Sequence, residues 1–206
     1  MAKLTFYYGT MSSGKTIDLI QTAYKYNSNG MKAVILKPKT DTKGNDKIVS
    51  RIGLEKKVDI ILGKDESLFE YSNVLKDITC LLVDEAQFLT EIQIKELFIL
   101  TKELDIPVIC YGIRNDFQGN LFEGSKALFC YADNFEKLKA VCATKGCGNN
   151  ANFNARKITG KYIYEGPQVL IGEDESYDPL CTSCYINKVL KPHCKEYQKI
   201  LLKINS

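Results

Sequence analysis

The segment LTFYYGTMSSGKTIDLI, residues 4–20, decides the fold. Within it, Gly9, Gly14, Lys15 and Thr16 have the spacing G-x-x-x-x-G-K-[ST] of a phosphate-binding loop. An apolar run precedes the loop and an amphipathic segment follows it, so the motif lies between an expected strand and an expected helix. The alternative is a chance glycine turn before a helix. The complete context favours a nucleotide-binding α/β protein.

Apolar runs alternate with helical segments through the first two thirds of the chain. Strands are expected at 32–38, 58–62 and 106–112 and in the apolar run 80–88, which ends in two acids, and helices at 15–27, 67–77 and 91–104. The last helix should begin at a capping box of Thr90 and Gln93. The polar, glycine-punctuated stretch 40–56 predicts a loop. Because the strand runs are apolar throughout, we expect a parallel sheet with helices on both faces.

The composition is that of a soluble globular protein. The 206 residues are 45% hydrophobic and 26% charged, and a net charge of +3 is too small to predict a nucleic-acid or membrane partner. The N-terminal sequence has no secretory pattern, and no apolar run has membrane-spanning length. We therefore expect a cytoplasmic protein, in which the eight cysteines are not expected to form disulfides.

The character of the sequence changes after about residue 135, where segments become short and rich in Gly, Asn, Tyr and Cys. We predict a nucleotide-binding α/β domain over 1–138, a small second domain over 139–190 and a basic C-terminal tail over 191–206. The lysines that follow residue 185 are more typical of a solvated tail or helix than of an RNA-binding segment.

The phosphate loop and a pair of acids predict phosphoryl chemistry. The backbone N–H groups of 10–16 would surround the terminal phosphates, Lys15 would reach the β- and γ-oxygens, and the Thr16 hydroxyl would hold Mg²⁺. Asp84 follows a buried strand and could also reach Mg²⁺, while Glu85 is a candidate general base. The pair is common to hydrolases and kinases, and the alternative is an ordinary acidic strand end.

Two cysteine pairs predict a metal site. Cys142 and Cys147 are separated from Cys181 and Cys184 by 33 residues, and four thiolates can hold one structural Zn²⁺. Two disulfides or four inert thiols are the alternatives. Of the other cysteines, Cys80, Cys110 and Cys130 lie in apolar runs and are expected in the core, whereas the pair His193 and Cys194 is expected at the surface.

Four motifs and the cysteine pairs occur together in one family. The motifs are GTMSSGKT (9–16), VDEAQF (83–88), YGIRNDFQGNLF (111–122) and EGPQVLIGEDESY (165–177). With these motifs in this order, the chain resembles the type II thymidine kinases. The resemblance covers about residues 3–187. It implies a P-loop (RecA-like) parallel sheet, a small zinc-ribbon domain with a lasso over the nucleoside, ATP with Mg²⁺ and thymidine as substrates, thymidine triphosphate as inhibitor, and a homotetramer.

The resemblance also implies roles for individual residues. Glu85 is similar to the base that takes the proton from the nucleoside 5′-hydroxyl. The positions implied for ATP and its phosphates are Gly9, Thr10, Met11, Ser12, Ser13, Gly14, Lys15, Thr16, Asp41, Lys43, Asp84 and Gln87. The positions implied for thymidine are Met11, Phe88, Ile113, Phe117, Phe122, Gln168, Val169, Leu170, Ile171, Gly172 and Tyr177. The implied zinc ligands are the four paired cysteines.

Two other functions are compatible with parts of this pattern. One is a RecA-like ATPase whose zinc ribbon binds DNA, although residues 142–184 carry as much acidic as basic character. The other is a nucleotide-gated scaffold without turnover, which gives Glu85 no role. The sequence departs from the family where Asp-x-Arg is replaced by Asp41-Thr42-Lys43, so Arg51 or Arg114 could supply the missing contact to the triphosphate.

Overall fold

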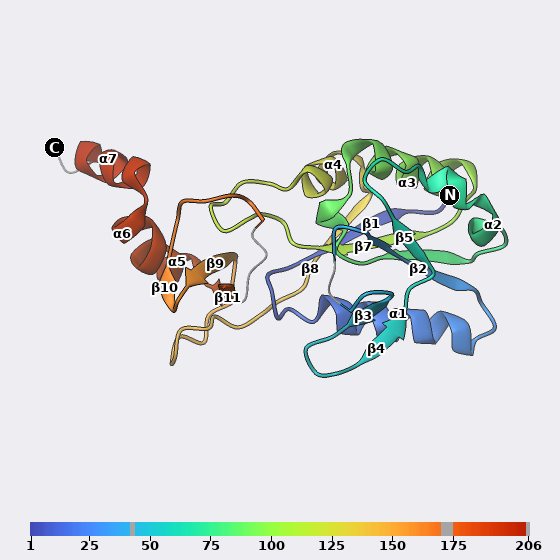
Figure 1. Cartoon of the computed structure of the whole chain (residues 1–206), viewed down its shortest axis with the longest axis horizontal. Coiled ribbons are helices and arrows are strands. Elements are labelled where there is room, and N and C mark those ends of the chain that lie inside the picture. Colours follow the sequence, from blue (N-terminus) through green and yellow to red (C-terminus); the bar gives the residue numbers. More distant parts are fainter. Residues whose placement is uncertain (42–43, 170–174, 205–206) are drawn as a thin grey trace. The chain divides into compact units, whose positions relative to one another are not determined.

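The computed structural model describes residues 1–41, 44–169 and 175–204 (Figure 1). The predicted site residues Lys43, Leu170, Ile171 and Gly172 lie outside the described residues. The chain forms two compact units. The first comprises Met1–Gly9, Gly14–Arg114 and Leu121–Leu138, and the second comprises Thr10–Ser13, Asn115–Asn120 and Lys139–Ser206. The predicted division into a nucleotide-binding domain, a zinc domain and a tail stays a prediction.

A six-stranded sheet in the order β5-β2-β6-β7-β1-β8 forms the centre of the first unit. Its strands are β1 (Leu4–Tyr8), β2 (Ala33–Pro38), β5 (Ile60–Leu62), β6 (Cys80–Val83), β7 (Val108–Gly112) and β8 (Asn134–Lys137). Every neighbouring pair is parallel. The strands β2 and β6 are buried along their whole length, as strands covered on both faces should be. The predicted parallel α/β fold is confirmed.

Helices cover both faces of this sheet (Figure 1). On one face α1 (Lys15–Ser28) buries Leu19 and Ala23 in a cluster with Ile35 of β2. The opposite face carries α3 (Glu91–Glu103), α4 (Glu123–Tyr131), and the short pair η1 (Leu68–Tyr71) and α2 (Ser72–Leu75). There Leu97 and Leu128 pack in a second cluster. The two clusters hold the sheet rigidly, so the carboxyl ends of its strands form a fixed edge.

The capping box at the start of α3 is confirmed. The Thr90 side chain accepts a hydrogen bond from the backbone N–H of Gln93 at 3.2 Å, and Gln93 Oε1 accepts one from the backbone N–H of Thr90 at 3.1 Å. Each bond satisfies a donor that the first helical turn would leave without a partner. The Gln93 Nε2 also donates to the carbonyl of Gly63 at 2.7 Å, which ties the helix start to the loop after β5.

The prediction of a loop over 40–56 was wrong in part. The structure has a short antiparallel hairpin of β3 (Lys47–Val49) and β4 (Glu55–Lys57), in which Ile48 pairs with Lys56. Ile48 is almost fully buried and packs with Ala33 and Val58. A single inward-facing apolar residue in a three-residue strand leaves too weak an alternation for the sequence pattern to predict a strand.

The second unit is built on the antiparallel sheet β10-β9-β11, with β9 (Phe153–Ile158), β10 (Lys161–Tyr162) and β11 (Glu175–Leu180). The chain continues through α5 (Thr182–Tyr185), the π-helical turn η3 (Ile186–Leu190), α6 (Lys191–His193) and α7 (Lys195–Ile204). Ala155, Leu180, Tyr185 and Val189 form its small core together with cysteines. A core of this size benefits from a metal or another cross-link.

Two cysteine predictions were wrong. Cys194, expected at the surface, is buried at the junction of α6 and α7, where its Sγ accepts from the backbone N–H of Tyr197 at 3.4 Å. Cys130, expected in the core, is exposed on α4. Cys80 and Cys110 are buried in β6 and β7 as predicted. A local apolar run does not show which face of a helix is covered, which explains the error at Cys130.

Candidate functional site

The phosphate-binding motif connects β1 to α1. Gly14 has φ 82° and immediately precedes α1, a left-handed conformation that glycine adopts at little cost. Ser12 also has a positive φ, 63°, and strained residues of this kind are frequent at ligand sites. Lys15 is buried, and its Nζ donates to the carbonyl of Gly9 at 3.2 Å. The lysine therefore lies against the first glycine of the loop.

The surroundings of Lys15 combine burial with nearby carboxylates. Burial lowers the pKa of Lys15, the charges of Glu85 and Asp84 act in the opposite direction, and Arg51 lowers the pKa further. Arg51 is thus close enough to Lys15 to act on it electrostatically. A buried ammonium group beside two carboxylates is suited to hold the additional negative charge of a triphosphate.

The acidic pair lies at the end of β6, next to β7 in the sheet. Asp84 is buried, and burial together with the charge of Glu85 raises its pKa to about 7. The Asp84 Oδ1 accepts from the backbone N–H of Glu85 at 3.1 Å. Glu85 has φ 48°, which sends the chain into the 3₁₀ turn η2 (Ala86–Phe88). The two carboxyl groups are therefore held in unlike surroundings, and the paired charges can attract a divalent cation.

Gln87 has a role that the sequence did not predict. It is buried, its Nε2 donates to Glu85 Oε2, and its Oε1 accepts from the backbone N–H of Ile113 at 3.1 Å. The sequence resemblance implied a contact from Gln87 to ATP, which stays a prediction. In the structure Gln87 connects the Glu85 carboxylate to the residue that follows β7, so it fixes the position of Glu85.

Three of the apolar residues predicted to contact the base, Phe88, Ile113 and Phe122, belong to the first unit. The rings of Phe88 and Phe122 pack edge to face, with centroids 5.8 Å apart. Ile113 is buried, and its carbonyl accepts from Ser125 Oγ of α4 at 2.6 Å. Gly124 lies so close to η2 that a Cβ there would be 2.3 Å from the carbonyl oxygen of Ala86. This close approach of α4 to η2 brings the two phenylalanines together.

Asp41, the other acid assigned to the nucleotide, pairs with a buried lysine. Lys37 Nζ lies 3.3 Å from Asp41 Oδ2, and the Lys37 side chain is 1% exposed. The sequence did not single out Lys37, because it interrupts the apolar run of β2 by one residue only. The neighbouring Lys43 is outside the described residues. Arg51 is exposed and Arg114 half-buried, and a triphosphate contact from either one stays a prediction.

The second unit carries the remaining predicted residues. The backbone N–H of Met11 donates to Oδ1 of Asn154, a buried residue of β9, at 2.8 Å. Phe117 is buried under the guanidinium of Arg156, which also lies over the ring of Tyr177 of β11. Of the other predicted residues in this unit, Thr10 is buried, Ser12 exposed, Ser13 half-buried, and Gln168 and Val169 exposed. Neither Asn154 nor Arg156 belongs to a motif, so sequence reasoning missed both.

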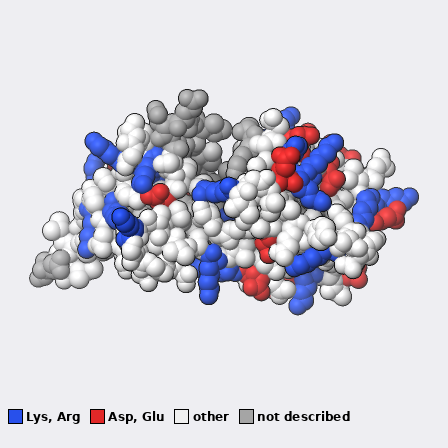
Figure 2. All heavy atoms as spheres, turned by 90° about the horizontal axis from the view of Figure 1, so that it is seen from below, with Lys and Arg blue, Asp and Glu red and all other residues white. Residues whose placement is uncertain are grey.

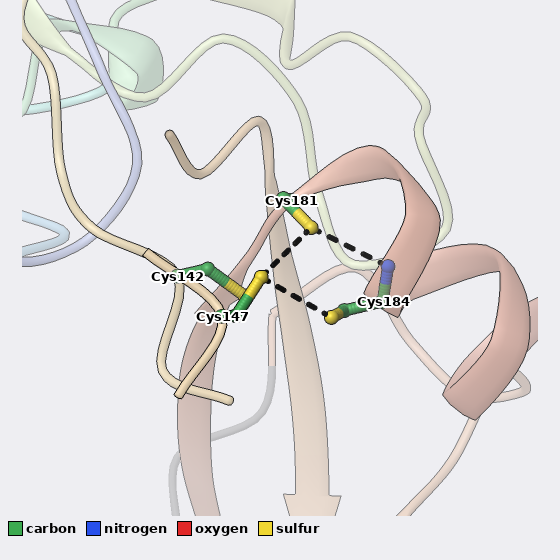
Figure 3. Close-up of side chains that lie close together, drawn as sticks. All are labelled: Cys142, Cys147, Cys181 and Cys184. Carbon is green, nitrogen blue, oxygen red and sulfur yellow. Dashed lines mark hydrogen bonds between the residues drawn. The ribbon is translucent and has the colours of Figure 1, made fainter. Parts of the chain in front are cut away.

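Four cysteine sulfurs form a candidate metal centre (Figure 3). The Sγ atoms of Cys142, Cys147, Cys181 and Cys184 all lie within 4.8 Å of one another. The Sγ of Cys147 is 3.6 Å from that of Cys181 and 3.7 Å from that of Cys184. Sulfurs around tetrahedral zinc are separated by about 3.8 Å, whereas a disulfide needs about 2 Å. The donor set and its spacing fit zinc, and all eight cysteines of the described chain are free thiols.

The pKa values of two cluster cysteines shift in opposite directions: that of Cys184 is raised to about 11, and that of Cys142 is lowered. Burial opposes its ionisation, but hydrogen bonds from the backbone at Cys181 and Thr144 and from neighbouring side chains lower its pKa to about 6. A thiolate is the form that ligates zinc. Because four sulfurs complete a tetrahedral shell, a zinc ion here would stabilise the unit and would leave no coordination position for a substrate.

Charged side chains of both signs are distributed over the surface. On the face drawn in Figure 2, Lys and Arg side chains are scattered among uncharged residues and interspersed with Asp and Glu.

Among the residues that the structure describes, no helix combines the length and the apolar character needed to cross a membrane.

Comparisons with known proteins all point to one family. A family model described as thymidine kinase matches residues 2–185. A thymidine kinase of Rhodopirellula baltica is 44% identical over 185 residues, which are 88% of this chain and 86% of that protein. One of Lactobacillus johnsonii is 41% identical over 197 residues, 91% of this chain and 98% of that protein. One of Shewanella oneidensis is 40% identical over 185 residues, with coverage of 88% and 95%.

Proposed function

The chain belongs to the thymidine kinase family, and from this premise we propose that it transfers the γ-phosphoryl group of ATP to the 5′-hydroxyl of thymidine. The observation that carries the proposal is the arrangement at the carboxyl edge of the sheet. A buried Lys15 adjoins the phosphate loop, and the charges of Asp84 and Glu85 act on it. Family membership makes the protein a kinase; the residue roles below are our proposal.

In this proposal the phosphate loop and the acids at the end of β6 carry out phosphoryl transfer. Backbone N–H groups of the loop bind the phosphates, and Lys15 stabilises charge on the β- and γ-oxygens as the γ-phosphoryl group moves. Thr16 and Asp84 hold Mg²⁺, which neutralises charge on the phosphates when it is bound. Asp41 and either Lys43, Arg51 or Arg114 complete the contacts to the triphosphate.

Glu85 is the general base of the reaction. Its carboxylate accepts the proton of the 5′-hydroxyl as the oxygen attacks the γ-phosphorus, and ADP leaves. The bond from Gln87 Nε2 to Glu85 Oε2 supports this role, because it fixes the carboxylate through one of its two oxygens. A glutamate that activates water for hydrolysis would need the same position and the same basicity. The nucleoside-binding residues therefore decide whether water or a nucleoside accepts the phosphoryl group.

Thymidine binds to the apolar residues and the lasso. Phe88, Ile113, Phe117 and Phe122 surround the thymine ring, and Met11 lies near the 5-methyl group. Gln168–Gly172 and Tyr177 cover the base and recognise it mainly through main-chain groups. We propose that deoxyuridine is also accepted, that the product is thymidine monophosphate, and that thymidine triphosphate inhibits by occupying the nucleoside and phosphate sites together.

We also propose that one structural Zn²⁺ is bound by the four cysteines and that the protein assembles as a homotetramer. The spacing of the sulfurs supports the first statement. The second rests on the family alone.

One experiment separates this function from its alternatives. ATP consumption is measured with thymidine, with single-stranded DNA, and with neither. The proposal expects consumption that depends on thymidine and is unaffected by DNA. Stimulation by DNA alone would instead support a DNA-dependent ATPase, and no consumption in any arm would support a nucleotide-gated scaffold.

A further inference from the structure

Arg156 is the largest of the fully buried side chains among the described residues, with no exposed surface. It lies in β9 directly opposite Tyr177 of β11. An arginine keeps its charge inside a protein, so burying it is costly unless its N–H groups are hydrogen-bonded. A side chain retained under this cost usually holds surrounding groups in a specific arrangement.

The three nitrogens of Arg156 each bond a different acceptor. Nε donates to the hydroxyl of Tyr177 at 2.9 Å, Nη1 to the carbonyl of Pro167 at 2.7 Å, and Nη2 to the carbonyl of Gln168 at 3.0 Å. The guanidinium carbon lies 3.8 Å from the centroid of the Phe117 ring. One planar group thus joins the start of the lasso to a strand and to a residue of the loop 115–120.

Asp116 makes a second connection between the same two segments. Its Oδ1 accepts from the backbone N–H groups of Gln118 and Asn120, both at 2.9 Å, and so shapes the loop 115–120. Its Oδ2 accepts from Nε2 of Gln168 at 3.0 Å. The carbonyl and the side-chain amide of Gln168 are therefore both bound within the protein.

We propose that Arg156 is a positioning residue that holds Pro167 and Gln168, the described start of the lasso, in register with Phe117 for nucleoside binding. This inference rests on the proposed function, in which both segments contact thymidine. It also assigns Gln168 a role other than base recognition. Gln168 anchors the segment, because its carbonyl is hydrogen-bonded to Arg156 and its side-chain amide to Asp116.

The geometry sets a condition that only arginine meets. The acceptors on Pro167, Gln168 and Tyr177 each receive a hydrogen bond from a different nitrogen of one guanidinium, whose donors are held in a fixed planar fork. A lysine ammonium keeps the charge and the cation–π contact with Phe117 but cannot reach all three acceptors. Arg156→Lys therefore separates loss of the fork from loss of the charge.

The test compares steady-state kinetics of Arg156→Lys, Arg156→Met and the control Lys157→Met. Lys157 is the next residue of β9 and pairs with Asp178, so its replacement also removes a bonded cation from the same strand. We expect both Arg156 variants to raise the KM for thymidine by about 10- to 100-fold, since small displacements of positioning groups have effects of this size. The KM for ATP should stay within about twofold, as in the control.

A second readout does not depend on activity. Glu165 is exposed just before the segment that Arg156 binds, and a glutamyl endopeptidase can cut after it when the backbone there opens. Without nucleoside, we expect cleavage at Glu165 to be faster in both Arg156 variants than in wild type, and unchanged in Lys157→Met. If wild type proves unable to phosphorylate thymidine, the proposed function fails, while this readout still tests whether Arg156 holds the segment.

The outcomes against the proposal are specific. Full recovery of the thymidine KM in Arg156→Lys would show that charge is sufficient and the fork is not required. Equal increases in the KM for thymidine and for ATP would show a general structural role. Should both Arg156 variants fail to fold, Tyr177→Phe removes only the acceptor of Nε, and unchanged cleavage at Glu165 in that variant would overturn the proposal.

Discussion

Gln87 binds the Glu85 carboxylate through its side-chain amide and, through its Oε1, accepts the backbone N–H of Ile113 at 3.1 Å. The glutamate therefore has one fixed oxygen, although it lies in a strained turn with φ 48°. Strain of this kind persists only where neighbouring bonds enforce it. The arrangement explains how a base can be held at the end of β6 on a residue that ordinary turn preferences would not place there.

Replacing Glu85 tests the assignment of the base. Glu85→Gln keeps the size of the side chain but removes its basicity, so kcat should fall by about 10²- to 10⁴-fold while thymidine still binds. Gln87→Met keeps the carboxylate but removes its amide partner, and should lower kcat by only about tenfold. Steady-state kinetics and thymidine titration measure both. Weakened binding with an unchanged kcat would assign Glu85 to substrate positioning.

Lys15→Ala should abolish activity without unfolding the protein. The mutation removes the cation whose attraction to the β- and γ-oxygens increases during transfer, a loss of about 10²-fold or more in kcat. Removing one partner from a group of buried charges lowers stability, so we expect a lower melting temperature in a protein that is still folded at the assay temperature. Turnover at saturating ATP and a thermal unfolding curve provide the measurement. Near-wild-type turnover would contradict the assignment of the phosphate loop.

The raised pKa of Asp84 predicts a pH-dependent affinity for Mg²⁺. Between the usual carboxyl pKa near 4 and about 7, the folded metal-free protein keeps a proton that the unfolded chain has lost, so its free energy of unfolding falls as pH rises through this interval. Mg²⁺ requires the ionised form, and its apparent affinity should increase from pH 6 to pH 8. Mg²⁺ titrations of wild type and Asp84→Asn test this; the same pH dependence in both would contradict it.

Zinc removal should loosen the zinc-bearing region after residue 139 before it affects ATP binding. Metal binding to four thiolates contributes on the order of 10 kcal/mol to the folding of a small domain. Elemental analysis should find one zinc per chain. Cys181→Ser should raise the thymidine KM and increase hydrogen exchange over 140–169, while Cys130→Ser, at an exposed cysteine outside the cluster, should change neither. Absence of zinc in protein purified without chelators would contradict the prediction.

Main-chain recognition of the base predicts the order of nucleosides. Cytosine places an acceptor at N3 and a donor at N4, so main-chain groups matched to thymine would be opposed, and discrimination of about 10⁴-fold is expected. Deoxyuridine lacks only a methyl group, worth roughly 1–3 kcal/mol. The ratios of kcat/KM for thymidine, deoxyuridine and deoxycytidine measure this order. Comparable values for deoxycytidine and thymidine would exclude main-chain recognition.

The sequence was sufficient to predict the elements that depend on a local pattern of residue types. The continuous apolar runs predicted β2, β6 and β7, and Thr90 with Gln93 predicted the start of α3. The spacing of the cysteines predicted the cluster because short loops bring paired ligands together regardless of the rest of the fold.

Several of the interactions that the sequence missed are made between distant segments. Arg156 looks like an exposed charge in the alternating run FNARKI, yet it is buried because Phe117, 39 positions earlier in the chain, covers it. Asn154 bonds Met11 across 143 positions. Such contacts are set by tertiary packing, which local periodicity does not encode. The burial of Cys194 follows the same rule.

The central claim is that the γ-phosphoryl group goes to thymidine and not to water. The most direct measurement follows ATP labelled in the γ-phosphate and quantifies labelled thymidine monophosphate, ADP and inorganic phosphate in one reaction. The account predicts one thymidine monophosphate for each ADP formed and almost no free phosphate, with both products lost together in Glu85→Gln. Release of inorganic phosphate at the rate of ADP formation, without labelled nucleotide product, would contradict it.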